Sequence, residues 1–250
     1  MNNSKPLTIA LAQISVNRGD VPSNTQKHLQ YIEKAAQLSA DYIVFPELSL
    51  TGYEPDLASS LAFDHNDVRL QPIAEACTKW NITAVVGAPI RMQQGVAIGE
   101  YIVFPSGNAS IYTKRYLHTG EDVFFVPGTL NPTLVEGNET LAFAICADTN
   151  NPAHSETASN NRATTYIASV FISPGGYAKD TAVMQAFAEK YKMSVFMANF
   201  SGRSSGYESA GGSAVWDRDG REVARLDGND EGMLVVRKNS ENCWEAIPAL

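Results

Sequence analysis

The 250-residue sequence has no long hydrophobic run and comparatively little positive charge. No stretch approaches the roughly 20 consecutive apolar residues that a membrane-spanning helix needs, and the N-terminal residues 1–6 lack the apolar core of a secretory signal. The 19 lysine and arginine residues are outnumbered by 27 acidic ones, which gives a net charge of −8. Nucleic acids and anionic membranes attract clustered positive charge, so neither is expected as a partner. We therefore expect a cytoplasmic protein.

Cysteine and histidine are scarce, and their spacing excludes two common kinds of site. The three cysteines, Cys77, Cys146 and Cys243, are far apart and form no C-x-x-C pair, so they indicate neither a disulfide framework nor a zinc site. The four histidines occur singly and match no metal-ligand spacing. We therefore expect no bound metal ion.

Short apolar runs alternate with amphipathic segments, which predicts strands interleaved with helices. The hydrophobic content of 44% is ordinary for a globular protein, and a chain of this length can form a single α/β domain. No internal repeat and no linker divides it. Strands are expected at residues 8–14, 42–45, 82–87, 96–104, 109–112, 141–145, 166–172, 194–199, 214–216 and 233–236.

The helical segments are fewer. One is expected over residues 24–39, with Ser23 and Gln26 spaced as a capping box. Another begins near Pro72, where apolar residues recur at helical spacing and place Cys77 in the core, which makes it unreactive. The remaining expectations are a helix over 178–192 and a polar stretch without a regular element over 149–165.

Three reactive side chains each lie at or just past the end of an expected strand: Glu47, Lys114 and Cys146. A cysteine thiol becomes a strong nucleophile only beside a base or a cation. Glu47 is the candidate base, and Lys114 offers a positive charge to a tetrahedral oxyanion. Asp148 is expected to anchor the turn after Cys146. Each residue alone could be a core cysteine or a surface charge, but together they suit covalent hydrolysis of an amide.

The segments around these side chains resemble three motifs of the nitrilase, or carbon–nitrogen hydrolase, superfamily. Residues 45–53 (FPELSLTGY) are similar to its catalytic-glutamate motif, residues 112–117 (YTKRYL) to its catalytic-lysine segment, and residues 145–148 (ICAD) to its nucleophile elbow. The order and the spacing of the motifs also fit. The resemblance implies a four-layer α/β fold, an α-β-β-α sandwich of two mixed sheets flanked by helices.

The resemblance covers most of the chain. It implies one carbon–nitrogen hydrolase domain over residues 1–250, with a core at about 7–236 and a short C-terminal tail. It also implies a homodimer or a larger homo-oligomer, and an enzyme that needs no cofactor.

The resemblance further implies a mechanism. Glu47 takes the proton of the Cys146 thiol, the thiolate attacks the amide carbonyl carbon, and Lys114 holds the oxyanion. A water molecule activated by the same carboxylate then cleaves the thioester. The implied site residues are Glu47, Lys114 and Cys146 as the catalytic set, Glu121 as a supporting carboxylate, and Tyr53 and the backbone N–H of Ala147 at the substrate and oxyanion.

The sequence departs from many relatives after the cysteine. Residues 149–153 are neutral where relatives that hydrolyse N-carbamoyl amino acids carry arginines, which clamp a carboxylate through two parallel hydrogen bonds. This departure argues against that activity. Arg203 could supply a clamp from another loop, or it could be an exposed arginine in a flexible segment.

The leading hypothesis is therefore an amidase that cleaves a small aliphatic amide, such as an ω-amide of a dicarboxylate, to acid and ammonia. Hydrolysis of an N-carbamoyl amine or a nitrile stays open, although nitrilases are usually longer. N-Acyl transfer is disfavoured by the lack of membrane spans, and an ammonia-channelling synthetase by the lack of a following domain. The alternative outside enzymology is a binding protein of the same fold that has no turnover.

Overall fold

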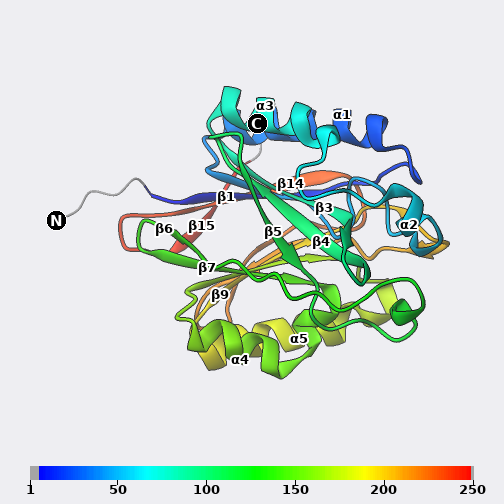
Figure 1. The fold of residues 1–250 in the computed structure, drawn as a ribbon. Helices are drawn as coiled ribbons and strands as arrows, with labels where there is room; N and C mark the ends of the chain where they lie inside the picture. The colour runs from blue at the N-terminus through cyan, green and yellow to red at the C-terminus, as the bar shows by residue number, and fades with distance from the viewer. Residues whose placement is uncertain (1–5, 249–250) are drawn as a thin grey trace.

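The structure, a computed structural model, describes residues 6–248 and has four layers (Figure 1). Helices α1 (Val21–Gln37) and α3 (Gln71–Trp80) cover a seven-stranded sheet, and α4 (Pro152–Asn160) and α5 (Pro174–Tyr191) cover a six-stranded sheet. The two sheets pack against each other between the helical layers. This arrangement confirms the expected α-β-β-α sandwich. The expectation that the N-terminus is not a secretory signal concerns residues 1–6, of which residues 1–5 lie outside the described part of the chain.

The seven-stranded sheet is mixed. From one edge to the other its strands are β15 (Trp244–Ile247), β14 (Gly232–Lys238), β1 (Thr8–Gln13), β2 (Tyr42–Val44), β3 (Thr83–Met92), β4 (Gly95–Val103) and β5 (Ala109–Thr113). The three strands β1, β2 and β3 run parallel, and the other neighbours run antiparallel. A tight turn closes the hairpin between β4 and β5, with Phe104 N donating to Asn108 O at 2.9 Å.

The six-stranded sheet is also mixed. Its order is β13 (Glu222–Arg225), β12 (Ala214–Trp216), β9 (Ser194–Asn199), β8 (Thr165–Val170), β7 (Glu139–Ile145) and β6 (Leu134–Glu136). Strands β7, β8 and β9 run parallel, so their carboxyl ends lie at one edge of the sheet. The remaining elements are α2 (Ala58–Leu61), the hairpin of β10 (Arg203–Ser204) and β11 (Tyr207–Glu208), and the short 3₁₀ turns η1 (Pro55–Leu57), η2 (Val68–Leu70), η3 (Glu121–Val123) and η4 (Cys146–Asn150).

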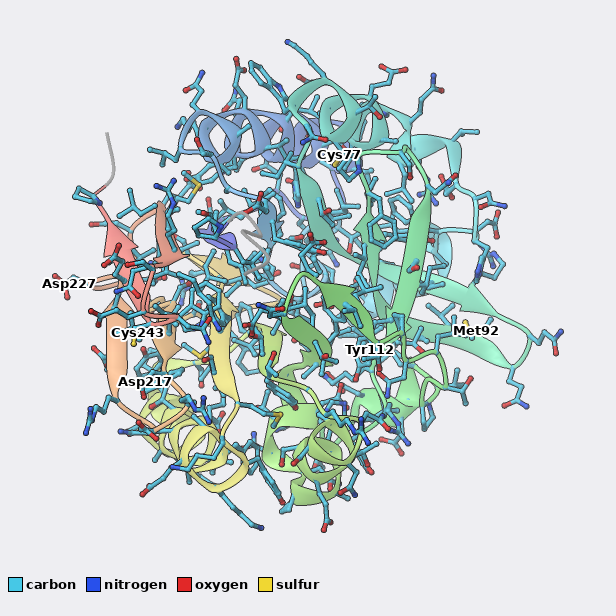
Figure 2. All side chains as sticks on the ribbon, turned by 90° about the vertical axis from the view of Figure 1, so that its left-hand side faces the viewer. Cys77, Met92, Tyr112, Asp217, Asp227 and Cys243 are labelled. Carbon is cyan, nitrogen blue, oxygen red and sulfur yellow. The ribbon has the colours of Figure 1, made fainter. Side chains whose placement is uncertain are left out.

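Apolar side chains fill the spaces between the four layers. One cluster lies between the two sheets and includes Leu11, Val85, Phe143 and Phe196. Burying a side chain of this size contributes about 1.5–3 kcal/mol, so this cluster holds the two sheets together. The outer cluster under α1 and α3 contains Cys77, which is fully buried, as expected (Figure 2). Burial raises the pKa of its thiol to about 12.

The first helix begins earlier than expected. Asp20 is its N-cap, and the Asp20 side chain accepts a hydrogen bond from Ser23 N at 3.2 Å. The capping box expected at Ser23 and Gln26 is therefore wrong. Pro22 lies in the first turn, where a proline costs no hydrogen bond, and this allows the helix to begin upstream of Ser23.

Several elements were not indicated by the sequence, among them α4 and β15. The stretch 149–165 contains α4, whose polar sequence shows no apolar stripe, although Asn151 caps it through a 3.0 Å bond to Ala153 N. The expected C-terminal tail contributes the edge strand β15. Its Trp244 donates from Nε1 to Ser194 Oγ at 3.0 Å and packs edge-on against Phe196. A single tryptophan anchors this strand, too weak a signal to predict it.

Candidate active site

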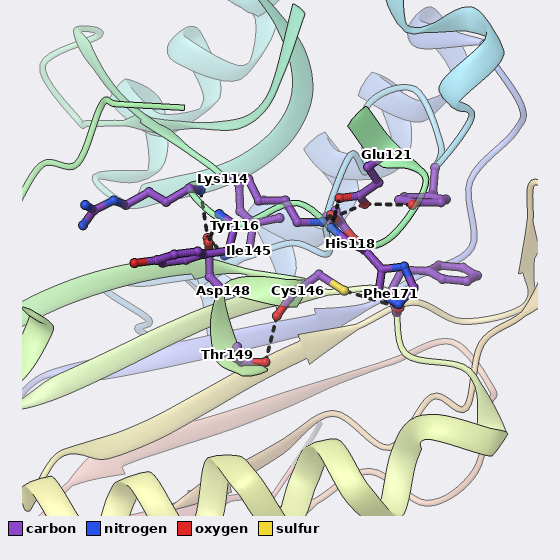
Figure 3. A network of polar contacts seen from close by, with 12 residues as sticks. Lys114, Tyr116, His118, Glu121, Ile145, Cys146, Asp148, Thr149 and Phe171 are labelled. Atoms are coloured by element: carbon purple, nitrogen blue, oxygen red, sulfur yellow. Dashed lines mark hydrogen bonds and ion pairs between the residues drawn. The ribbon is translucent and has the colours of Figure 1, made fainter. Parts of the chain in front are cut away.

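Three strand ends converge between the two sheets. Glu47 follows β2, Lys114 follows β5 and Cys146 follows β7. Figure 3 shows Lys114 and Cys146 in this region. The Lys114 ammonium donates to Glu47 Oε1 at 2.8 Å, and both side chains are completely buried. The seven-stranded sheet brings Glu47 to Lys114 although 67 residues separate them, and the facing six-stranded sheet brings Cys146. The structure thus collects the three groups that the sequence singled out.

The backbone around Glu47 fits tightly against β3. Leu48 has a φ of 52°, a left-handed conformation that is uncommon for a leucine. Neighbouring hydrogen bonds hold it there, since Phe45 N donates to Val85 O and Leu50 N to Gly87 O, both at 2.9 Å. A Cβ at Gly87 would lie 2.3 Å from Leu48 N, so only glycine allows this close approach. The position of the Glu47 carboxylate is therefore fixed by the strand beneath it.

The turn at Cys146 is strained in a similar way. Cys146 has a φ of 42° and begins the 3₁₀ turn η4, a conformation that a non-glycine residue adopts at an energetic cost. The Thr149 hydroxyl donates to Cys146 O at 2.8 Å and closes the turn (Figure 3). Ala147 is the next residue of this turn, so its backbone N–H lies beside the nucleophile.

Asp148 anchors the turn to the other sheet, as expected. Its buried carboxylate accepts hydrogen bonds from Ile145 N at 3.0 Å, from Arg115 N at 3.0 Å and from Tyr116 N at 2.9 Å. The last two donors come from the segment that follows Lys114. One carboxylate therefore ties the nucleophile's turn to the lysine's turn.

A buried aromatic network extends from this anchor. Tyr112 donates from its hydroxyl to Asp148 Oδ2 at 2.5 Å, and the same hydroxyl lies 2.8 Å from His154 Nε2. The other ring nitrogen of His154 lies 2.7 Å from the Tyr166 hydroxyl. Burial lowers the pKa of His154, so the histidine is neutral and serves as structure in the core.

Glu121 lies on the other side of the lysine. Glu121 Oε1 accepts from Lys114 Nζ and from the Tyr53 hydroxyl, both at 2.8 Å, and its second oxygen accepts from His118 N at 2.7 Å. The Tyr53 ring stacks on Phe171 with centroids 5.6 Å apart. Lys114 thus uses two of its three N–H groups on carboxylates, which leaves the third for another acceptor.

The electrostatics favour a neutral thiol in the resting site. Burial raises the pKa of Glu47 to about 7, because it outweighs the opposing effect of the Lys114 charge. Burial disfavours the charge of Lys114, but the neighbouring carboxylates outweigh burial and raise the pKa of its ammonium. Burial together with the Glu47 charge raises the pKa of the Cys146 thiol above its usual range. The thiol therefore needs a base at the moment of attack.

The thiol has two acceptors within reach. Cys146 Sγ donates to Phe171 O at 3.7 Å (Figure 3), and its interaction with Glu47 lowers the pKa of that carboxyl. The other carboxylate oxygen, Glu47 Oε2, is buried and has no partner of ordinary hydrogen-bond geometry. Because one thiol hydrogen serves one acceptor at a time, a rotation about the Cβ–Sγ bond is enough to direct it to Glu47.

A pocket of about 590 Å³ opens beside this cluster, a volume within the range of roughly 300–1,000 Å³ usual for small-molecule sites. Arg203 is exposed and is not among the lining residues, whereas the loop that follows it is. The pocket is lined by Arg18, Tyr53, Glu54, Pro55, Asp56, Thr119, Gly120, Glu121, Phe124, Ser205, Gly206 and Tyr207.

The structure also places residues at or near the site that the sequence did not single out. Arg18, Tyr207 and the Phe171 carbonyl come from loops whose paths a sequence does not reveal. Glu54 directly follows the glutamate motif, and Tyr112 begins the lysine motif, so proximity to a motif was the available signal. Within the described part of the chain, no three His, Cys, Asp or Glu side chains are grouped to hold a metal ion. No helix among residues 6–248 has the length and apolar character to cross a membrane.

The fold and the converging strand ends define a hydrolase of the nitrilase type. The chain belongs to the carbon–nitrogen hydrolase family, whose sequence profile matches residues 8–247. The match confirms the resemblance that the three motifs suggested.

Curated relatives include two kinds of enzyme. The chain is 28% identical over 238 residues to the glutamine-dependent NAD(+) synthetase of Thermotoga maritima, a match that covers 88% of this chain and 40% of that protein. It is 27% identical over 232 residues to an (R)-stereoselective amidase of Pseudomonas sp., covering 92% of this chain and 84% of that protein. The chain spans less than half the length of the NAD(+) synthetases that head these matches.

Solved structures give the same fold. An amidase of the nitrilase superfamily from Nesterenkonia sp. AN1, in a variant form, superposes with a TM-score of 0.86 at 22% identity, and the match covers 94% of this chain and 92% of that one. This likeness shows a shared fold, and the family match places the chain among the carbon–nitrogen hydrolases.

Proposed function

We propose that the protein is a cofactor-independent amidase that cleaves a small amide to a carboxylic acid and ammonia through a thioester on Cys146. The observation that supports this most is the buried ion-pair set: Lys114 Nζ lies 2.8 Å from both Glu47 and Glu121, beside a neutral thiol. A buried lysine and two carboxylates are costly to desolvate, and so favour a function for the cluster over stability alone.

Acylation begins with the thiol proton. Glu47 Oε2 accepts it while Cys146 Sγ forms a bond to the amide carbonyl carbon, and the carbonyl electron pair moves to oxygen. A pKa of about 7 makes Glu47 a stronger base than an ordinary carboxylate. Collapse of the tetrahedral intermediate breaks the C–N bond. The departing nitrogen takes the proton from Glu47 and leaves as ammonia.

The oxyanion needs donors that are already in place. The third N–H of Lys114 and the backbone N–H of Ala147 supply them. Loss of one such donor typically costs about 3–4 kcal/mol of transition-state stabilisation. Glu121 and Tyr53 act through Lys114, because their mutual contacts fix the direction of the ammonium.

Deacylation repeats the sequence with water in place of the thiol. Glu47 takes a proton from water, the hydroxide oxygen bonds to the thioester carbon, and the Cys146 thiolate leaves. Glu47 then returns the proton to the sulfur, and the carboxylic acid departs. One carboxyl group thus serves as base and acid in both halves of the cycle.

Small aliphatic amides are the proposed substrates. A variant of the Nesterenkonia sp. AN1 amidase, at 22% identity and a TM-score of 0.85, was solved in complex with butyramide. The neutral segment that follows Cys146 holds no arginine for a carboxylate, which makes N-carbamoyl amino acids a secondary alternative. Nitriles remain a further alternative. We further propose that the enzyme works in the cytoplasm as a homodimer or larger homo-oligomer.

A second candidate is release of ammonia from glutamine, as a part of a larger assembly. The specific observation is the match to glutamine-dependent NAD(+) synthetases, which reaches 45% identity over 134 residues in Acinetobacter baylyi, 46% of this chain. In that case glutamine would be hydrolysed in preference to simple amides.

The test is a library of amides assayed for ammonia release, with Cys146→Ala as the blank. The library pairs acetamide, propionamide and butyramide with glutamine, N-carbamoyl amino acids and the matching nitriles. We expect release from the simple amides, and a thioester adduct on Cys146 after a rapid acid quench and mass spectrometry. Ammonia release that persists in the Cys146→Ala protein would contradict the thioester. Absence of release from every compound would favour a non-catalytic binding protein.

A further inference from the structure

The rim of the pocket has an unusual balance of charge. Among its lining residues, Arg18 is the single cation, whereas Glu54, Asp56 and Glu121 are carboxylates. We infer that this pocket selects amides whose acyl chain ends in a neutral or positively charged group, and discriminates against amides whose chain ends in a carboxylate. This inference rests on the proposed amidase function.

Arg18 is already engaged with protein carboxylates. Its Nε donates to Glu54 Oε2 at 3.0 Å, and its Nη2 forms a close ion pair with Asp56 Oδ2. These contacts use two of the five N–H groups of Arg18, and the two carboxylates offset its positive charge, so a substrate carboxylate meets little net attraction there. Arg203, the other arginine considered as a clamp, does not line the pocket.

Two of the three carboxylates are fully occupied. Glu54 is 6% exposed, and its Oε1 accepts from Ser204 Oγ at 3.0 Å and from Ser205 N at 2.8 Å. Glu121 uses both oxygens on Lys114, Tyr53 and His118. These bonds hold both side chains in place, so neither carboxyl group can turn away from an incoming anion.

Asp56 is the carboxylate that a substrate can meet. Its side chain is 54% exposed, and Arg18 contacts it through one oxygen, Oδ2. A terminal ammonium can pair with this carboxylate, and a neutral chain end can rest on the exposed aromatic rings of Phe124 and Tyr207 instead. A terminal carboxylate gains neither contact and is repelled. The pocket thus accepts two chain ends and rejects the third.

The discriminating experiment uses three amides with the same five-carbon chain: pentanamide, 5-aminopentanamide and the monoamide of glutaric acid. We expect kcat/KM for the first two to exceed that for the glutaric monoamide by about tenfold at low salt, the scale of one like-charge contact at a partly solvated rim. The ratio should shrink in 0.5 M salt, because the Debye length falls to a few ångströms.

A matched pair of variants separates the rim from the net charge. Asp56→Asn removes a rim carboxylate and frees one side of Arg18, so the ratio of pentanamide to glutaric monoamide should fall at least about threefold. Asp219→Asn removes the same formal charge from an exposed pair with Lys192, outside the pocket, and should leave the ratio unchanged.

Each outcome decides the question. A glutaric monoamide turned over as well as pentanamide, or an equal effect of Asp56→Asn and Asp219→Asn, would overturn the inference. If none of the three amides is hydrolysed, the proposed function fails. Binding of the amides can then be ranked by how strongly each one slows the alkylation of Cys146 by iodoacetamide. Stronger protection by pentanamide and 5-aminopentanamide than by the glutaric monoamide would still support the inferred selectivity of the pocket. Strongest protection by the glutaric monoamide would refute it.

Discussion

Two cations of this enzyme each bridge two carboxylates, and their surroundings differ. Lys114 lies between Glu47 and Glu121 with no solvent exposure, whereas Arg18 joins Glu54 to Asp56 with 55% of its side chain exposed. In water a single charge contact is worth less than 1 kcal/mol, but in a buried site the same contact must offset a desolvation cost of several kcal/mol per ion. Removal of one partner therefore has very different consequences in the two places.

The comparison shows that burial decides what a cation between two carboxylates can do. The buried set is held by paired contacts and shifts the pKa of its members, which suits proton transfer. At the rim, Arg18 and Asp56 are more than half exposed, so this set can select ligands only through a weak, screened field. The same arrangement of a cation between two acids thus does chemistry in one place and recognition in the other.

The largest expected effect comes from the nucleophile beside the buried set. Cys146→Ala and Cys146→Ser should both reduce amide turnover below about one per cent, because a carboxylate is too weak a base to activate a serine hydroxyl. Steady-state ammonia release measures the loss, and an unchanged melting temperature shows that the fold is intact. Substantial activity in Cys146→Ser would contradict the thioester route.

Replacement of the buried cation should come next. Lys114→Ala should lower kcat by roughly two to three orders of magnitude, since it removes an oxyanion donor, and Lys114→Arg should restore little because a planar guanidinium is wider than an ammonium. Rates with a fixed amide check this expectation. If arginine works nearly as well as lysine, the proposed contact with the oxyanion is wrong.

The proton carrier of the buried set gives a pH dependence. Glu47 acts as base only when ionised and its pKa lies at about 7, so kcat/KM should fall about tenfold per pH unit below pH 7. Glu47→Gln should still allow an amide to protect Cys146 from alkylation, while no acyl-enzyme accumulates in a mass spectrum. A stable acyl adduct in this variant would limit Glu47 to the later hydrolysis step.

One further carboxylate, that of Glu100, shows what burial does without a cation. Glu100 is fully buried, neither of its oxygens has a partner of ordinary geometry, and burial raises the pKa of its carboxyl well above 4.5. The folded state therefore holds this proton when the unfolded state has lost it. The free energy of unfolding should fall by about 1.4 kcal/mol per pH unit as the pH rises above 4.5.

Glu100→Gln isolates that contribution. The variant cannot ionise at this position, so its stability relative to the parent should increase from pH 5 to pH 7, as measured by urea denaturation at each pH. Parallel stability curves for the two proteins would mean that Glu100 does not stay protonated in the fold.

The smallest effect is expected at the rim. Arg18→Gln should change the free energy of unfolding by about 0.2–1 kcal/mol, the usual range for exposed ion pairs, and the change should diminish in 0.5 M salt. Lys192→Gln, which breaks the exposed pair with Asp219, provides a matched control. A salt-independent loss several times larger would show that Arg18 is buried in the working enzyme.

The sequence predicted some elements better than others. Strand β9 and the buried face of α3 were found because their residues are apolar at the period of the element. Helix α4 was missed because its nine residues are mostly polar and form no apolar stripe. The start of α1 was misplaced because Asp20 and Ser23 are both good caps. The edge strand β15 packs through one tryptophan, which carries no periodic signal.

The sequence alone determined the family, because the three motifs that carry Glu47, Lys114 and Cys146 depend on local order and spacing, and the resemblance to that family implied the four-layer fold. Only the tertiary structure decided which charged side chains are buried and which are exposed to solvent. Two facing sheets excluded water from Lys114 and shifted the pKa of Glu47, while loops far apart in the chain placed Arg18 beside Glu54 and Ser205. Desolvation depends on what surrounds a side chain in space, and a linear sequence does not contain that information.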